Sequence, residues 1–244
     1  MSESTLLKLQ EPVQRPSVTE AVFEELHRQI LALDLTPGTK MSEVDVARIM
    51  GVSRQPVRDA FYRLSTLGFL TIRPQRATVV SAISEAAVMQ ARFIRAAIEA
   101  ETVRMACARL GEDDFAALEA VLDRQRAAVE ARDPVGFHAL DDLFHRQICE
   151  RSGHGFAWDI IRENKAHMDR VRFLSLSFAS QDAYGDHLEV MAALRSRDAP
   201  RAMAAMHVHL LRIKVQIRRI RAEHEAFFDG EQVSSSAPAL RPPF

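Results

Sequence analysis

The part of the chain from about residue 84 onwards has long stretches of helical apolar spacing and few residues that interrupt helices. It contains no run of alternating apolar and polar residues, and glycine and proline are scarce. Helical spacing over such a length, broken only by short polar segments, predicts an all-α domain. We expect an antiparallel bundle of about six helices, near residues 84–110, 113–132, 134–151, 155–178, 181–197 and 199–228.

The first part of the chain has a different pattern, with three helical segments followed by two β-rich runs. The segment "TEAVFEELHRQILALDL" has helical apolar spacing and ends at "TPG". Ser42 begins a short helix through Met50, and Ser53 caps another that ends near Leu67. The runs "FLTIRP" and "ATVVSAI" predict a hairpin. This order is typical of a winged helix-turn-helix, which places one helix in the major groove of DNA. The chain as a whole is therefore predicted to be mainly α.

Positive charge is concentrated in the segment expected to contact DNA. Five arginines against one acid give residues 54–76 a charge of +4, whereas the whole chain carries −1. Arginine binds guanine edges or phosphate, and a helix N-terminus attracts phosphate. The alternative, a solvated basic face on a structural bundle, does not explain why the charge coincides with this helix and hairpin. The predicted DNA-binding residues are Ser53, Arg54, Gln55 and Arg58 in the helix, with Arg73 and Arg76 in the wing.

Composition fits a globular protein, with 47% hydrophobic and 27% charged residues. No apolar run approaches the length of a membrane span, and the first ten residues lack the apolar core of a secretory signal. We therefore expect a cytoplasmic protein whose two cysteines are reduced. The expected organisation is a flexible arm (1–15), a DNA-binding domain (16–81), a helical domain (82–228) and a disordered Ser/Pro-rich tail (229–244).

The segment from Leu35 to Val80 strongly resembles the DNA-binding domain of the GntR family of bacterial transcription regulators. The matching elements are the "L-x-P-G" turn, "SEVDVA", "GVSRQPVRDA" and "RLSTLGFL". The resemblance implies DNA contacts at the same four helix positions and in the wing. One difference concerns the wing turn, where the family usually has Arg-Gly and this chain has Arg76-Ala77. Since alanine resists a positive φ, we expect a different shape or reach of the wing tip.

A polar stripe within "DDLFHRQICE" predicts a site inside the helical domain. Asp141, His145 and Cys149 are spaced i, i+4, i+8 and so share one side of a helix, flanked by apolar residues. Asp141 and His145 can chelate a metal ion from that side, and histidines of other helices can complete a nitrogen-rich site. Cys149 fits better as a small core residue. Periodicity does not select the other ligands among His138, His154, His167, His187, His207, His209 and His224.

The helical part is similar to the FCD effector domain of the same family, through "RAAIEAETVRMA", "DDLFHRQI", "DHLEVMAALRSRD" and "AMHVHL". The resemblance implies a metal held by Asp141, His145, His187 and His209. Three histidines and one aspartate suit Zn²⁺ or Ni²⁺, and Mn²⁺ through oxygen ligands. Six helices indicate the shorter, metal-containing (VanR-like) form of the domain, in place of the longer form that binds acyl-coenzyme A.

Arginines near this site bear on the ligand that the domain would bind. Arg95 matches the arginine of the family's "R-x-x-L-E" and is the candidate for binding a small carboxylate effector, an organic or sugar acid. For Arg92, Arg170 and Arg172 we expect exposed helix positions.

The leading functional hypothesis is a homodimeric regulator that binds double-stranded operator DNA, responds to an acid and has no catalytic activity. A metal-dependent enzyme of small carboxylates fused to a DNA-binding module is an alternative. It would need a general base, for which Glu99, Asp142 and Glu189 are available without any pattern that marks them. A regulator that senses the metal ion itself is a further alternative.

Overall fold

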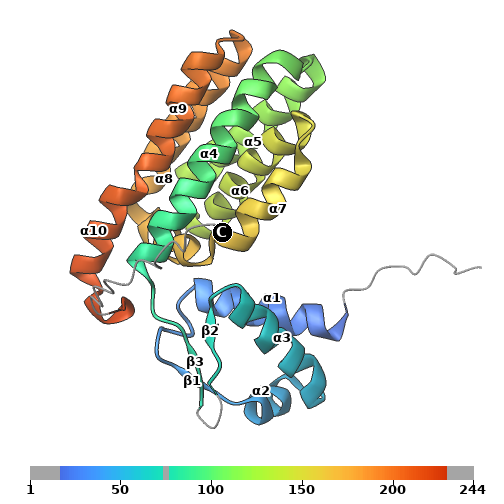
Figure 1. Ribbon diagram of the computed structural model, residues 1–244, viewed down its shortest axis with the longest axis vertical. Coiled ribbons are helices and arrows are strands. Elements are labelled where there is room, and N and C mark those ends of the chain that lie inside the picture. The colour runs from blue at the N-terminus through green and yellow to red at the C-terminus, as the bar shows by residue number, and fades with distance from the viewer. Residues whose placement is uncertain (1–16, 74–76, 230–244) are drawn as a thin grey trace, which may run out of the picture.

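A winged helix-turn-helix forms the lower part of the molecule in Figure 1. The computed structural model describes residues 17–73 and 77–229, so the predicted arm, nearly all of the predicted tail, and Arg76 lie outside the described residues. The helices are α1 (Val18–Leu31), α2 (Glu43–Met50) and α3 (Arg54–Thr66), and the strands are β1 (Lys40–Met41), β2 (Leu70–Thr71) and β3 (Thr78–Val80). The sheet is antiparallel in the order β1-β3-β2.

The predicted helices and hairpin are confirmed, but the sequence missed β1. The strand has two residues and pairs Lys40 with Val79, which is too short for alternation to reveal. The helix boundaries follow local chemistry. The Ser42 hydroxyl accepts the Asp45 N–H at 3.3 Å, and Gly51 ends α2 in the left-handed conformation at φ 66°.

The upper part of the molecule is the predicted antiparallel helical domain (Figure 1). Its helices are α4 (Glu85–Arg109), α5 (Glu112–Glu130), α6 (Pro134–Arg151), α7 (Gly155–Asn164), α8 (Ala166–Arg195), α9 (Ala199–Leu211) and α10 (Ile213–Glu223), followed by a 3-10 turn, η1 (Glu225–Phe227). No helix among residues 17–73 and 77–229 is long and apolar enough to cross a membrane.

Two helix boundaries differ from the prediction. The predicted break at "FASQ" was wrong. That segment contains no strong helix breaker, and it lies inside α8, which is 30 residues long. The break falls instead at Lys165, whose ammonium group binds Asp142 and Asp169 at 2.6 and 2.8 Å. The last predicted helix divides at Arg212, whose guanidinium binds Asp186 on α8. Both breaks coincide with long-range ion pairs, which a local pattern does not reveal.

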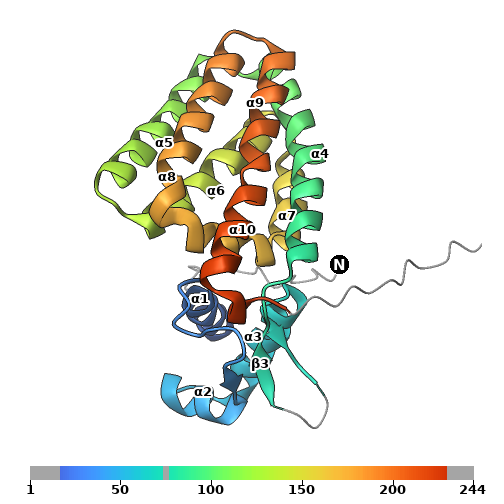
Figure 2. The ribbon, with the colours of Figure 1, turned by 90° about the vertical axis from the view of Figure 1, so that its left-hand side faces the viewer.

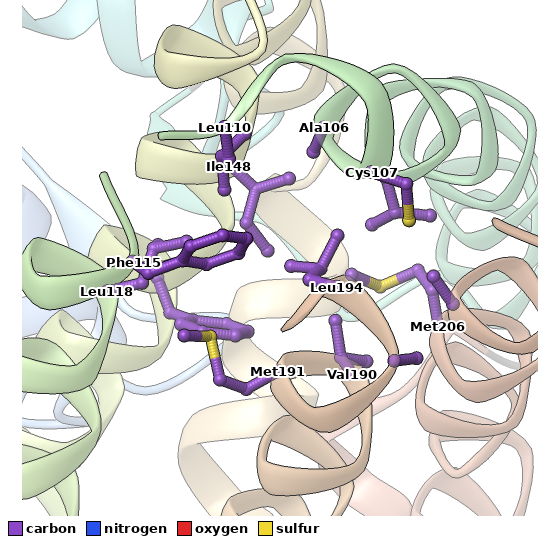
Figure 3. Packing of buried hydrophobic residues seen from close by; sticks show 14 of the residues in the cluster. Ala106, Cys107, Leu110, Phe115, Leu118, Ile148, Val190, Met191, Leu194 and Met206 are labelled. Carbon is purple, nitrogen blue, oxygen red and sulfur yellow. The ribbon is translucent and has the colours of Figure 1, made fainter. Parts of the chain in front are cut away.

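The core of the helical domain is built from α4, α5, α6, α8 and α9 (Figure 3). Phe115 and Leu118 of α5 pack in one cluster with Leu194 of α8 and Met206 of α9. Each of these side chains is at most 2% exposed. Truncating such a side chain typically costs about 2–5 kcal/mol, so the cluster holds the helices in a fixed relation. The fixed positions of these helices also determine where the polar side chains of α6, α8 and α9 lie, which are described below.

The two parts of the molecule meet at the start of α8. The Ser84 N–H donates a hydrogen bond to Nδ1 of His167 at 3.1 Å. On the other side of the ring, Nε2 lies against Gly68 of the first domain. A side chain at this position would place its Cβ only 3.1 Å from Nε2, and the backbone φ of +80° also favours glycine. Burial lowers the pKa of His167 to about 4, so the ring is neutral near pH 7 and Nδ1 remains an acceptor.

This contact predicts a specific loss of stability in acid. The unfolded chain binds a proton at His167 below its ordinary pKa of 6.5, whereas the folded chain binds it only near 4. The free energy of unfolding should therefore fall as the pH drops from about 6.5 to 4, by up to about 3 kcal/mol. We expect His167→Gln, which keeps an acceptor that does not titrate, to flatten this dependence in urea unfolding of metal-free protein.

Other buried histidines titrate in the same direction, so the measure is the difference in slope between the wild type and His167→Gln. Equal slopes in the two proteins would contradict the assigned role of His167.

Candidate metal centre and nucleic-acid interface

Four side chains from three helices converge inside the helical domain. α6 supplies Asp141 and His145, α8 supplies His187, and α9 supplies His209. Their ligand atoms all lie within 4.8 Å of one another, and the first three residues are buried. The structure thus brings together the four residues that the resemblance implied, from segments up to 68 positions apart, and makes them a candidate metal site.

Each of the three imidazole rings is oriented by a second contact. His145 Nδ1 lies 2.5 Å from Glu99 Oε2 on α4, and His209 Nδ1 lies 3.5 Å from Asp186 Oδ2. His187 Nδ1 lies 2.9 Å from Gln125 Oε1 on α5. In all three cases an oxygen faces Nδ1, so the proton belongs there and the Nε2 lone pair points to the centre of the cluster.

The sequence did not identify these three partners, Glu99, Gln125 and Asp186, in this role. A clue existed for Glu99, which follows Arg95 by four residues on one helix. Asp186 is next to the candidate ligand His187 in the sequence, but the ring that it contacts is that of His209. For Gln125 there was no clue, since it lies 62 residues from the histidine that it orients. The Gln125 amide nitrogen donates to the Leu140 carbonyl at 2.9 Å, which fixes its oxygen toward His187.

The donor set fits a divalent cation. His145 Nε2 and His209 Nε2 are 3.2 Å apart, close to the roughly 3.0–3.4 Å expected for two nitrogens that share one zinc ion at about 2.1 Å. His187 Nε2 is buried and has no hydrogen-bond partner among the described residues. Burial lowers the pKa of His187 and of His209, which leaves both rings neutral and their lone pairs available.

Asp141 is kept ionised by charge. Burial opposes its ionisation, but the guanidinium group of Arg172 holds its pKa well below the usual range. Arg172 binds Asp141 Oδ2, while Asp141 Oδ1 lies 3.6 Å from His187 Nε2. Oδ2 also lies 3.8 Å from His145 Nε2, so both oxygens are near ligand nitrogens while the arginine holds the carboxylate in place. The expectation that Arg172 is exposed was wrong: the side chain is 11% exposed because it also binds Asp142 and Asp169, at 2.9 and 3.0 Å.

A small cavity of about 40 Å³ adjoins the candidate metal site. Its lining includes Arg95, Asp141, Arg172, His209, Arg212 and Gln216. Arg95 is 2% exposed and binds Glu99 Oε1 through Nε at 2.6 Å. Its Nη2 is buried without a hydrogen-bond partner among the described residues. The predicted effector-binding arginine therefore lies beside the predicted metal ligands and has a donor left for a ligand.

Three other expectations can be compared with the structure. Arg170 was expected to be exposed and is instead fully buried, because its guanidinium binds the backbone between the two domains. Arg92 is half-buried and not fully exposed. Cys149 packs with Ala157, Trp158 and Ile161, and burial raises the pKa of its thiol to about 12. Such a thiol stays protonated, as expected for a core residue.

The N-terminal half of α3 and its cap residue present the predicted DNA-contacting residues of the helix. Ser53, Arg54, Gln55 and Arg58 are all exposed, and Val57 on the opposite side is fully buried. Arg54 and Arg58 both reach Glu43 Oε2 on α2, at 3.5 and 3.3 Å. These exposed ion pairs are weak, so both guanidinium groups remain available to a stronger anion. Arg73 is also exposed, at the end of the described part of the wing.

The metal assignment predicts different effects for neighbouring histidines. His187→Ala and His209→Ala should lower the metal content and the melting temperature, because an ion that binds only the folded state stabilises it, by about 2.7 kcal/mol at one hundred times its Kd. His207→Ala should change neither, since His207 is exposed on another face of α9. Elemental analysis and thermal unfolding measure both effects. Loss of metal from His207→Ala with full occupancy in His209→Ala would exclude the assigned ligand set.

Comparisons with known proteins agree with these features. Residues 18–80 match the model described as bacterial regulatory proteins, gntR family, and residues 90–212 match the FCD domain. The chain is 38% identical over 216 residues to the HTH-type transcriptional repressor RspR of Escherichia coli (strain K12), covering 88% of this chain and 95% of that protein. It is 33% identical over 210 residues to an HTH-type transcriptional regulator in an unstable DNA locus of Streptomyces ambofaciens, covering 85% and 88%.

A solved structure shows the same fold. E. coli McbR/YncC superposes with a TM-score of 0.72 at 22% identity and covers 84% of this chain and 99% of that chain. Together with the two family matches and the 38% identical relative, the winged helix and the helical domain give one conclusion. The chain belongs to the GntR family of bacterial transcription regulators, carries an FCD domain, and is a DNA-binding regulator and not an enzyme.

Proposed function

We propose that this regulator is switched by a small carboxylate, an organic or sugar acid, that binds at a metal site in the helical domain. The observation that carries the proposal is Arg95 Nη2, a buried cationic donor without a partner among the described residues, in a cavity that Asp141 and His209 also line. A buried arginine donor left unpaired is costly, so an anionic ligand gains energy by satisfying it.

A divalent cation held by Asp141, His145, His187 and His209 would add positive charge that attracts the same anion. We propose Zn²⁺, with Ni²⁺ and Mn²⁺ as the other candidates for this donor set. The cavity of about 40 Å³ has room for two or three water-sized groups, which is the scale of a carboxylate. A larger acid requires side chains of the lining, such as Met168 or Arg212, to move, so binding and local rearrangement are coupled.

For the first domain, we propose that residues 16–81 bind operator DNA. Ser53, Arg54, Gln55 and Arg58 contact base edges and phosphates in the major groove, and Arg73 and Arg76 contact the backbone or the minor groove. On binding, Arg54 and Arg58 exchange Glu43 for DNA. By similarity to a relative named a repressor, we propose that the regulator represses transcription.

Substitution of the helix arginines should test this interface. Arg54→Ala or Arg58→Ala should weaken operator binding by about 1–3 kcal/mol each while leaving thermal unfolding unchanged, because both side chains are exposed. The matched control is Arg126→Ala, which removes the same charge from an exposed, ion-paired arginine on α5. Titrations at fixed salt measure the affinities. If both variants bind the operator as tightly as Arg126→Ala does, α3 is not the recognition helix.

We propose that the chain acts as a homodimer, since recognition helices of this type read two half-sites with two-fold symmetry. α4 and α7 offer a surface for it, because Phe93 is 68% exposed and Phe156 and Ile160 are 65% and 43% exposed. α4 and α7 pack against each other, and exposed apolar side chains on neighbouring helices favour a protein contact.

Light scattering at micromolar concentration should therefore find a dimer, and Phe156→Glu should weaken it. Val208→Glu is the control, because Val208 is 55% exposed on α9, on the other side of α4 from α7 (Figure 1). A wild-type protein that stays monomeric with and without DNA would rule out the proposed dimer.

The effector proposal predicts coupling between the two domains. A panel of small organic and sugar acids should contain one that changes operator affinity, by about 5–150-fold for a coupling of 1–3 kcal/mol. Arg95→Lys should weaken or abolish that response, since lysine keeps a charge near Glu99 but lacks the spare planar donor. His145→Ala should abolish it together with metal binding. If Zn²⁺ alone changes operator affinity and no acid does, the regulator senses the metal ion itself.

A further inference from the structure

The backbone that joins the two domains is held on one side by α8. The guanidinium group of Arg170 donates to the Ser81 carbonyl and, at 3.1 Å, to the Ala82 carbonyl. The next contact is the Ser84 N–H, which donates to His167 Nδ1 at 3.1 Å. Arg170 also donates to that nitrogen at 2.9 Å. Two side chains from one turn of α8 thus hold residues 81, 82 and 84.

The segment after α10 holds the remaining residue of the junction from another direction. The Ile83 N–H donates to the Phe227 carbonyl at 2.8 Å, and the Asp229 N–H donates to the Ile83 carbonyl at 3.0 Å. Ile83 and Phe228 form a parallel β-bridge and are 0% and 7% exposed. Figure 2 shows this segment beneath α10, where the chain passes from β3 into α4. We call Arg170, His167 and residues 227–229 the linker clamp.

The burial of Arg170 makes its hydrogen bonds to the linker carbonyls costly to break. Arg170 is fully buried, and its hydrogen bonds to described residues go to the two carbonyls and to His167. Burial lowers the pKa of Arg170 to about 10, so the group still carries its charge at neutral pH. A buried cation needs good acceptors to offset lost hydration. Movement of residues 81–82 away from Arg170 would leave that charge unsatisfied.

The linker clamp has two sides, one on α8 and one in the segment after α10, and both α8 and the start of α10 contribute residues to the lining of the cavity. On α8, Met168 and Arg172 line the cavity and alternate along the helix with the clamp residues His167 and Arg170. On the other side, His209 ends the metal set and Arg212 lines the cavity at the start of α10, which leads to residues 227–229. A rotation or shift of either helix at the cavity therefore moves a group that holds the linker.

We propose that the linker clamp reports the state of the effector site to the DNA-reading domain, with Arg170 as the positioning residue. The proposal rests on the proposed function and names its regulation. Occupation of the site fixes Arg172 and His209, which sets the first turns of α8 and α10. The clamp then holds residues 81–84, and with them β3 and the wing, in one position. Loss of the metal ion or arrival of an acid changes that position, as required of an element that both sites bias.

The test measures hydrogen exchange at the amides of Ile83, Ser84 and Asp229 in the full chain, with Zn²⁺ as the probe. Arg170→Met removes the donors but keeps a long side chain. Arg197→Met is the matched control, because Arg197 donates to the carbonyls of Cys107 and Leu110 beyond the opposite end of α8. We expect exchange at the three amides to rise about tenfold in Arg170→Met, since bonds to a charged donor are lost, and to stay unchanged in Arg197→Met.

In the wild type, stripping the metal ion with a chelator should speed exchange at the same amides, whereas in Arg170→Met exchange is already fast with and without Zn²⁺. Equal exchange in the Arg170→Met and Arg197→Met proteins overturns the proposal. Metal content, measured on the same samples, separates two further failures. A chain that binds no Zn²⁺ refutes the metal site itself, and bound Zn²⁺ that leaves wild-type exchange unchanged refutes only the clamp.

Discussion

The candidate site of the helical domain requires the burial of a carboxylate among three imidazole rings. Polar groups are costly to bury without partners, and four of them close together are tolerated only when each is held in place. The pair between His145 and Glu99 shows how this is done, since one carboxylate binds the ring of a candidate ligand and the guanidinium of Arg95. Burial opposes the ionisation of Glu99, but Arg95 and His145 outweigh this effect and lower its pKa. Glu99 therefore remains charged. One ion pair thus joins the metal position to the arginine proposed to bind the effector.

α8 connects this site to the rest of the molecule. Its C-terminal half contributes His187, and its first turns carry Arg172 at the cavity and Arg170 at the junction between the domains. A helix that continued from α7, as the sequence pattern predicted, would place these side chains differently. The interruption at Lys165, stabilised by Asp142 and Asp169, therefore sets the phase on which both the cavity and the junction depend.

Local patterns were sufficient for most of the fold, and family resemblance was needed for the candidate site. Helical spacing and caps such as Ser42 predicted the winged helix-turn-helix and a bundle of about six helices. Periodicity alone gave Asp141 and His145 but left the other ligands open, because His187 and His209 come from distant helices. Burial of Arg170 and Arg172 was not predicted, since their partners are carbonyls and carboxylates up to 89 residues away.

Charge around the site indicates the order in which its ligands bind. Asp182 pairs with Arg212 but is 64% exposed and is left out of the balance. The less exposed charged side chains around the site among the described residues are five carboxylates and four cations, which sum to −1 when the histidines bind a metal ion as neutral ligands: Glu99, Asp141, Asp142, Asp169, Asp186, Arg95, Lys165, Arg172 and Arg212. A site with a negative balance attracts a divalent cation and repels an acid. The cation changes the balance to +1, which a single carboxylate then neutralises. Arg95 alone is thus a poor anion trap while the metal ion is missing, because Glu99 already offsets its charge. The electrostatics therefore favour binding of the metal ion before the acid and make the affinity for the acid depend on the metal ion.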